Sequence, residues 1–246
     1  MKRDYLIKKA KDIINNFDLN ENNFNKMADD KKGNLVLSKS VIPDKVKIEF
    51  NNSCNCRVFI GSNVRGSFSI NINKDNSTVY IGDNCHLKQT ILKSECINDF
   101  IVLGNHVTTS GAVAFRSGLR SGNSSSAIIV GDDCMFSHGI TVRNTDAHPI
   151  WSIETMQQVN KPKDFIYIEP HVWIGQGAMI LKDVHIGACS IVAAGSIVTK
   201  SAERFSKIYG SPSKNKVDAT VFWSRSYTSE AKKTAQYFYD KYFCCE

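Results

Sequence analysis

The spacing of aliphatic side chains between Ile168 and Thr199 constrains the fold more than any other feature of the sequence. An Ile or Val recurs there at every sixth position: Ile168, Ile174, Ile180, Ile186, Val192 and Val198. A period of six fits neither the 3.6-residue period of an α-helix nor simple strand alternation. It fits short strands joined by tight corners that coil into a solenoid. Glycine after several of these aliphatic residues is expected to relax the corner backbone.

The rest of the hexad pattern supports the same interpretation. The fifth position of each hexad is also small or β-branched: Val172, Ala178, Val184, Ser190 and Ser196. Upstream, aliphatic-glycine pairs recur with longer and unequal gaps, at Ile60-Gly61, Ile81-Gly82, Leu103-Gly104 and Val130-Gly131. The gaps predict loops inserted near residues 115–126 and 144–164. An excursion as long as the second one is usually functional when it leaves a compact domain.

Both ends of the chain depart from the repeat. Residues 1–35 predict one or two short helices, because Tyr5, Leu6 and Ile13 belong to a rough apolar stripe among polar residues. Residues 36–216 are predicted to form the solenoid, and the aromatic residues of 217–246 suggest an amphipathic helix. Such ends would cap the terminal strands of a solenoid.

Composition excludes several classes of protein. The chain has 246 residues, 42% hydrophobic and 22% charged, which excludes disorder and collagen-like fibre and allows one good core. The net charge of +7 suits anionic small molecules or polyanions without demanding nucleic acid, and solubility alone could also explain it. Because no long apolar run occurs and the first residues carry charges throughout, we expect a cytoplasmic protein without a transmembrane segment.

The eight cysteines do not form a metal-binding or redox pattern. Without an export signal they are expected to be reduced thiols. Cys85 and Cys134 each lie three positions after a glycine, in the matching segments IGDNC and VGDDC. We interpret this as a slot for a small hydrophobic residue in a repeat.

Three segments together resemble a known family. They are the hexads, SHGITVRNTDAHPI followed by a loop and IEPHVWIGQGAMILKDVHIG, and the closing IYGSPSKNK. They resemble the hexapeptide-repeat acyltransferases, whose fold is a left-handed parallel β-helix, and within them the bacterial capsule and polysialic acid O-acetyltransferases. The resemblance is specific over about residues 130–216. It implies a homotrimer that binds acetyl-CoA between adjacent β-helices, with a histidine as the base and no metal.

His148 is the predicted general base. It lies in Asp146-Ala147-His148-Pro149, which resembles the histidine-proline signature of sugar O-acetyltransferases. A sugar hydroxyl is a poor nucleophile at neutral pH, so a base that titrates near pH 6.5 would help its attack on a thioester. Asp146 could orient His148 or could only form a turn. His138, before Gly139, is the rival base or an acceptor-orienting residue.

The remaining histidines are expected to be solvated or corner residues: His86, His106, His171 and His185. This argues against the γ-class carbonic anhydrases, which share the solenoid. Those enzymes need three zinc histidines, two of them in a close pair, and no two histidines here are five residues apart.

Trp173 is predicted to point outward, because it precedes an inward-facing isoleucine on a strand. An exposed tryptophan on a regular face calls for a partner. The resemblance implies that this indole helps to form the active site and the donor site near the base. A subunit contact is the alternative, and in a trimer both can hold.

Further site residues follow from the resemblance and from their positions. The terminal coil and closing turn imply donor contacts from Gly195, Lys200, Ser211 and Lys214. The two insertions suggest acceptor contacts from Arg143, Asn144, Arg116 and Arg120. The oxyanion donor would be a main-chain N–H that the sequence does not assign.

The sequence therefore predicts an acetyl-CoA-dependent O-acetyltransferase that acts on a sugar hydroxyl of a bacterial surface polysaccharide, with a sialic acid polymer as one candidate acceptor. Two other reactions stay open: N-acetylation of a nucleotide-linked amino sugar, and acetylation of a small acceptor. A non-catalytic β-helix that acts as a binding module is the alternative from another class.

Overall fold

The aliphatic residues of the six-residue repeat line the inside of a three-sided coil. In this computed structural model, which describes residues 2–118 and 126–244 and side chains from residue 8 onward, successive hexads fall on successive sides. Residues one full coil apart pair in register: Ile168 with Ile186, Ile174 with Val192, and Ile180 with Val198. All six side chains are fully buried, as are the five fifth-position residues of the hexads. The predicted solenoid is confirmed.

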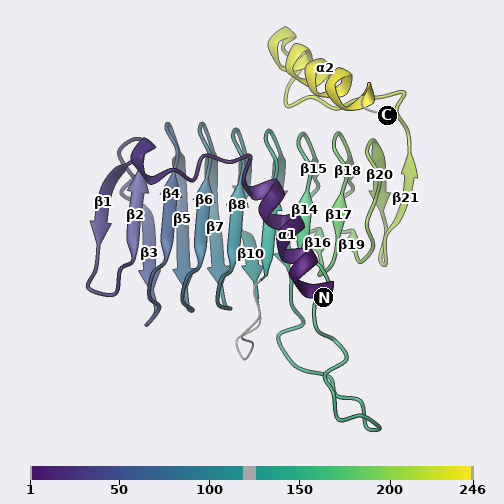
Figure 1. Ribbon diagram of the computed structural model, residues 1–246. Helices are drawn as coiled ribbons and strands as arrows, with labels where there is room; N and C mark the ends of the chain where they lie inside the picture. Colours follow the sequence, from purple (N-terminus) through teal and green to yellow (C-terminus); the bar gives the residue numbers. More distant parts are fainter. Residues whose placement is uncertain (1, 119–125, 245–246) are drawn as a thin grey trace.

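The strands stack along the coil axis on three sides, which we call faces 1, 2 and 3 (Figure 1). Face 1 contains β2 (Leu35–Ser38), β4 (Arg57–Ile60), β6 (Thr78–Ile81), β8 (Phe100–Leu103), β11 (Ala127–Val130), β14 (Ile166–Ile168) and β17 (His185–Ile186). β1 (Asn25–Asp29) pairs with β2 in the antiparallel direction and covers the first edge of this face.

Faces 2 and 3 share two long strands that turn the corner between them, β5 (Arg65–Ile72) and β7 (His86–Ser94). Face 2 continues through β9 (Thr108–Gly111), β12 (Met135–His138), β15 (Trp173–Ile174), β18 (Ile191–Val192), β20 (Ser206–Tyr209) and the antiparallel β21 (Lys214–Val217). Face 3 contains β3 (Val46–Phe50), then β10 (Val113–Ser117), β13 (Thr141–Arg143), β16 (Met179–Ile180) and β19 (Ile197–Val198).

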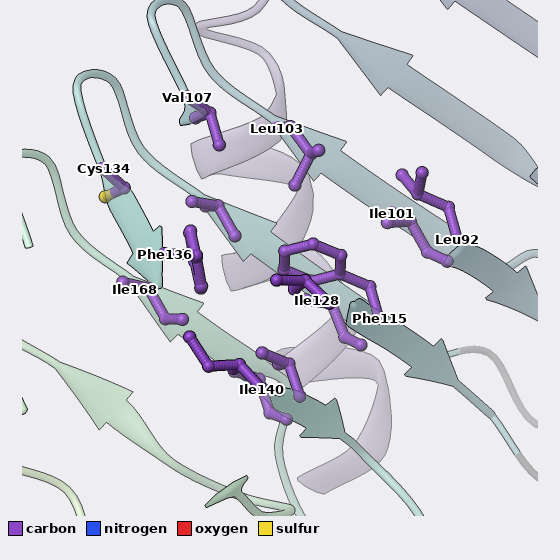
Figure 2. Close-up of a cluster of buried hydrophobic side chains, with 14 of the residues drawn as sticks. Leu92, Ile101, Leu103, Val107, Phe115, Ile128, Cys134, Phe136, Ile140 and Ile168 are labelled. Atoms are coloured by element: carbon purple, nitrogen blue, oxygen red, sulfur yellow. The ribbon is translucent and has the colours of Figure 1, made fainter. Parts of the chain in front are cut away.

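One continuous hydrophobic core fills the coil. Figure 2 shows part of it, with Phe115 and Phe136 among the aliphatic side chains; their rings meet edge to face at 5.3 Å. Cys85 and Cys134 fill inward positions and are buried, which confirms their interpretation as small hydrophobic residues. Burial raises the pKa of the Cys85 thiol to about 12 and also raises that of Cys134, so neither thiol is reactive at neutral pH.

The glycines after the inward aliphatic residues serve a different purpose from the one predicted. Gly175 and Gly187 lack the left-handed φ that a strained corner would need. A Cβ on Gly175 would lie 2.6 Å from the amide nitrogen of Ala194, and a Cβ on Gly187 would lie 2.3 Å from that of Arg204. The prediction of a relaxed corner backbone is wrong here, because the next coil approaches too closely for any side chain.

Both predicted insertions follow strands of face 3. β10 extends to Ser117 and buries Phe115, so residues 115–117 belong to the solenoid and not to the first predicted insertion. Arg120, from the same predicted insertion, lies outside the described residues. Residues 144–164, which we call the arm, project from the coil between β13 and β14 (Figure 1, lower right). A bridge between Trp151 and Gln158 joins the two legs of the arm.

Helices cover the outside of the coil near both ends of the chain. α1 (Lys2–Ile14) crosses face 1 and buries Ala10 and Ile14 against a row of outward side chains that includes Phe59 and Val102 (Figure 1). A 3₁₀ turn (Glu21–Asn23) follows it. α2 (Ser229–Phe243) is capped by the Thr228 side chain and buries Phe238. The predicted terminal helices are therefore present, and the C-terminal helix packs on the coil of its own chain.

Candidate active site

Three stacked glycines leave the backbone bare at the corner between faces 2 and 3. Gly139, Gly177 and Gly195 have φ values of +70°, +68° and +68°, a left-handed conformation that favours glycine. A Cβ on Gly177 or Gly195 would meet no atom within 4 Å. We call this the glycine corner. It leaves room for an extended ligand against the backbone, but the Gly177 and Gly195 amides donate to the carbonyls of His138 and Gln176, at 3.0 and 2.7 Å, and are not free to bind an oxyanion.

Trp173 points outward from face 2, as strand alternation predicted. It lies in register between Met135 and Ile191 and is half-buried. Part of its cover comes from its own chain, since its ring centroid is 6.2 Å from that of Trp223. The Trp173 Nε1 atom is buried and has no hydrogen-bond partner among the described residues. A buried indole N–H usually has a hydrogen-bond acceptor in a folded protein.

His148 lies on the first leg of the arm and is exposed. Its carbonyl accepts a hydrogen bond from Asn160 Nδ2 at 2.8 Å, whereas its imidazole makes no hydrogen bond to any described residue. The Asp146 carboxylate bonds to Lys182 and Asn160. Asp146 therefore does not orient the His148 ring by direct contact in this structure, and the ring is free to act on a ligand.

One chain does not place His148 and Trp173 on a common face. The arm that carries His148 leaves at the end of face 3, and Trp173 lies on face 2. His138, which ends β12 beside the glycine corner, is exposed and shares face 2 with Trp173.

Positive side chains form a row on face 3 at the base of the arm. Arg143 lies in register beside Arg116, which lies beside Lys93 on the next coil. Lys93 pairs with Glu95 at 3.0 Å. Neither arginine forms an ion pair with a described carboxylate, and the Arg143 Nε atom is buried without a partner. Like charges on adjacent strands are unfavourable unless an anion neutralises them.

Asn144, which the sequence grouped with these arginines, is instead part of the interior. It is 1% exposed, and its amide nitrogen donates to Ser126 Oγ at 2.8 Å and to the carbonyl of Asp164 at 3.3 Å. Its amide oxygen accepts from the Asp183 N–H at 3.3 Å. The structure thus gives Asn144 an anchoring role at the base of the arm and does not expose it to an acceptor.

The predicted donor residues divide between two corners. Gly195 and Ser211 lie near each other, because the Gly210 carbonyl accepts from the Ile197 amide at 3.0 Å. Lys214 begins β21 beside Tyr209, close to the same corner, and is exposed. Lys200 follows β19 and lies at the opposite end of face 3 from Gly195.

A buried polar cluster around His171 is a feature that the sequence did not reveal. The His171 ring stacks between those of Trp223 and Phe238, at 4.2 and 5.0 Å. Its nitrogens lie 2.6 Å from Asp133 Oδ2 and 3.1 Å from the Trp223 carbonyl. Burial would raise the pKa of Asp133, but the His171 hydrogen bond and the charge of Arg225 outweigh it and lower that pKa. His171 is a corner residue as predicted, yet it is buried.

The described residues lack two further kinds of feature. They contain no group of three or more His, Cys, Asp or Glu side chains arranged to hold a metal ion. In the same part of the chain, neither helix has the length and apolar character needed to cross a bilayer.

The stacked hexads define the class of this solenoid. Residues 165–200 match the family described as "Bacterial transferase hexapeptide (six repeats)". The resemblance to hexapeptide-repeat transferases is confirmed, and with it the left-handed parallel β-helix that this resemblance implied.

Named relatives share more specific similarity. The chain is 33% identical over 123 residues to a polysialic acid O-acetyltransferase of Neisseria meningitidis, covering 44% of this chain and 57% of that one. A polysialic acid O-acetyltransferase of Escherichia coli O1:K1 / APEC is 29% identical over 103 residues, covering 42% of this chain and 33% of that one. The match thus spans less than two thirds of either curated relative. The solved polysialic acid O-acetyltransferase OatWY superposes with a TM-score of 0.63 at 26% identity, covering 80% of this chain and 93% of that one.

Proposed function

We propose that this protein transfers an acetyl group from acetyl-CoA to a sugar hydroxyl of an anionic bacterial surface polysaccharide, with polysialic acid as the first acceptor to test. The observation that carries the proposal is the exposed imidazole of His148, which bonds to no described residue and lies next to Pro149 on the arm of a hexapeptide-repeat solenoid. The similarity to two polysialic acid O-acetyltransferases and to OatWY supports it.

The proposed reaction is a direct attack on the thioester. The His148 imidazole takes the proton of the sugar hydroxyl while the hydroxyl oxygen bonds to the acetyl carbonyl carbon. Collapse of the tetrahedral intermediate breaks the carbon-sulfur bond, and the proton passes from the imidazolium to the leaving CoA thiolate. A positioned base of this kind contributes roughly 10²- to 10⁴-fold to the rate.

The glycine corner is the proposed donor site. Its bare backbone can accommodate an extended pantetheine chain. Trp173 lies on the adjoining face, and its buried indole N–H has no acceptor in the part of the chain that the structure describes. Ser211 and Lys214 lie near the same corner and would contact the polar end of the donor. Lys200, at the other end of face 3, would contact a phosphate only if the donor crossed that face.

The acceptor site is proposed at the base of the arm. Arg116 and Arg143 present adjacent positive charges without a described acidic partner, and Arg143 Nε is buried and unsatisfied. Guanidinium groups bind carboxylates in a bidentate geometry. An anionic polymer would neutralise both arginines. Arg120 is proposed as a further contact of the same polymer, and it lies outside the described residues.

A homotrimer would complete the site. The arm exposes a large apolar surface, formed by Ile150, Trp151, Ile153, Met156 and Val159. Ile153 is 93% exposed, and a cluster of this kind usually marks an interaction site. In the proposed trimer the arm lies against the neighbouring coil and brings His148 to the partner's Trp173.

A thiol-release assay with acetyl-CoA tests the proposal across polysialic acid and a neutral polysaccharide. We expect turnover with polysialic acid and a loss of roughly 10²- to 10⁴-fold in His148→Ala at unchanged stability. His86→Ala is the matched control, because His86 is also exposed and lies on face 2, away from the arm. A small loss in His148→Ala with a large loss in His138→Ala would move the base to His138, and binding of a polysaccharide without turnover would favour a binding module.

A further inference from the structure

Asn160, on the returning leg of the arm, uses every hydrogen-bonding group of its side chain. Its Nδ2 donates to Asp146 Oδ2 at 2.9 Å and to the His148 carbonyl at 2.8 Å. Its Oδ1 accepts from the Ile150 amide at 2.8 Å and from Gln158 Nε2 at 3.0 Å. An amide side chain offers two N–H donors and an oxygen with two lone pairs, so this set of partners uses its full capacity.

The partners of Asn160 also fix which way its amide points. Asp146 Oδ2 and the His148 carbonyl can only accept, and the Ile150 N–H can only donate. The bonds to the His148 carbonyl and the Ile150 amide lie on the two sides of Pro149, whose ring restricts φ between them. They hold the main chain at His148, while its imidazole bonds to no described residue.

Lys182 connects these hydrogen bonds to the coil. Lys182 follows β16 on face 3, and its ammonium bonds to the Asp146 carboxylate and, at 3.1 Å, to the Asn160 carbonyl. The Lys182 side chain is 24% exposed and that of Asp146 39%, so water reaches this pair only in part. The path from solenoid to His148 runs through Lys182, Asp146 and Asn160.

We propose that Asn160 is a positioning residue for His148, with Lys182 and Asp146 fixing it to the solenoid. The proposal rests on the function of His148 proposed above. Asn160 acts on the main chain that carries the imidazole and touches neither substrate nor reacting atoms. A displacement of about 1 Å in a catalytic group can cost about 10²-fold in rate.

The kinetic test compares Asn160→Ala with Gln157→Ala, a matched control because Gln157 is an exposed amide on the same arm whose side chain bonds to no described residue. We expect Asn160→Ala to lower kcat by roughly 10- to 100-fold, with the KM for acetyl-CoA and the thermal midpoint unchanged. Asn160→Asp should be at least as slow, because it keeps the shape but loses both donors. Lys182→Met, which keeps most of the stem, should shift kcat in the same direction.

A double substitution separates positioning from a general structural role. In the His148→Ala background, Asn160→Ala should cause no further loss, because there is no imidazole left to position. An equal loss in both backgrounds, or an unchanged kcat in Asn160→Ala while His148→Ala is inactive, would overturn the proposal.

Amide hydrogen exchange keeps the inference testable apart from the proposed function. The Ile150 amide should exchange at least about tenfold faster in Asn160→Ala than in Gln157→Ala, since its bond to Asn160 Oδ1 is lost. If His148→Ala keeps full activity, the proposed base fails, yet this exchange result still decides whether Asn160 holds the His148 segment. An unchanged exchange rate of the Ile150 amide would refute the claim that Asn160 holds this main chain.

Discussion

Two buried carboxyl groups, Asp99 and Glu169, show how hydrogen-bond donors decide the charge of an acid inside the coil. Burial raises the pKa of Asp99 to about 7, because the hydrogen bond from Ser117 Oγ, at 2.7 Å, offsets only part of the desolvation. Burial acts on Glu169 in the same direction, but bonds from His185, Ala188 and Arg204 lower its pKa to about 2. Asp99 is therefore largely neutral below pH 7, whereas Glu169 is ionised.

Asp99→Asn should make the protein less sensitive to alkaline pH. Because the folded-state pKa of Asp99, about 7, lies above its unfolded value of about 3.9, its contribution to stability is full below pH 3.9 and is lost as pH rises through 7. The free energy of unfolding of Asp99→Asn relative to wild type should thus rise by about 3 kcal/mol between pH 5 and pH 8. Urea unfolding at the two pH values measures it.

The control for that experiment is Asp44→Asn, because Asp44 is exposed. The free energy of unfolding of Asp44→Asn relative to wild type should not change with pH. A flat difference for Asp99→Asn as well would show that Asp99 does not titrate near neutral pH in the folded protein.

Among the elements, the C-terminal segment is attached to the coil by Trp223 as well as by the helix α2. Trp223 is 6% exposed, stacks on His171, and donates its indole N–H to the His171 carbonyl at 3.0 Å. Arg225 continues the attachment, with a bond to Asp133 at 2.7 Å. These contacts hold the chain that leads into α2 against the corner between faces 1 and 2.

Trp223→Ala should detach this segment. Loss of a buried tryptophan costs about 3 kcal/mol or more, so we expect a drop of that size in the free energy of unfolding. Chemical denaturation measures it, together with the rate of proteolysis within residues 217–244. Tyr227→Ala is the matched control, since Tyr227 is a fully exposed aromatic residue four positions along the same segment, and its effect should stay within about 0.5 kcal/mol. Equal stabilities of the two variants would contradict the assigned contact.

The elements also show which features a sequence can predict. The hexads from Ile168 to Val198 specified the coil, because each aliphatic residue repeats the same inward position. The burial of His171 was not predictable, since it depends on Trp223, fifty-two residues away in the chain. The hydrogen bonds of Asn160 were not predicted for the same reason. A polar residue in a long loop gives no periodic signal, and its partners come together only after folding.

For the whole molecule, the central feature is that Trp173 lies on face 2, whereas the arm that carries His148 leaves the coil at the end of face 3. The sequence indicated both residues through their local motifs, but no local motif encodes the face to which a distant residue belongs. A trimer with rotational symmetry brings different surfaces of adjacent copies together. We propose that the arm of one copy meets the glycine corner of the next, so that the active site exists only between chains.

Complementation between two inactive variants tests this claim most directly. His148→Ala and Trp173→Ala chains would be unfolded and refolded together in equal amounts, and thiol release from acetyl-CoA would be measured with polysialic acid as the acceptor. If each site takes His148 from one copy and Trp173 from its neighbour, random assembly restores both side chains in about a quarter of all sites, and turnover recovers to about that fraction of wild type. A mixture of confirmed trimeric mass that is no more active than the two variants refolded separately would contradict the shared site.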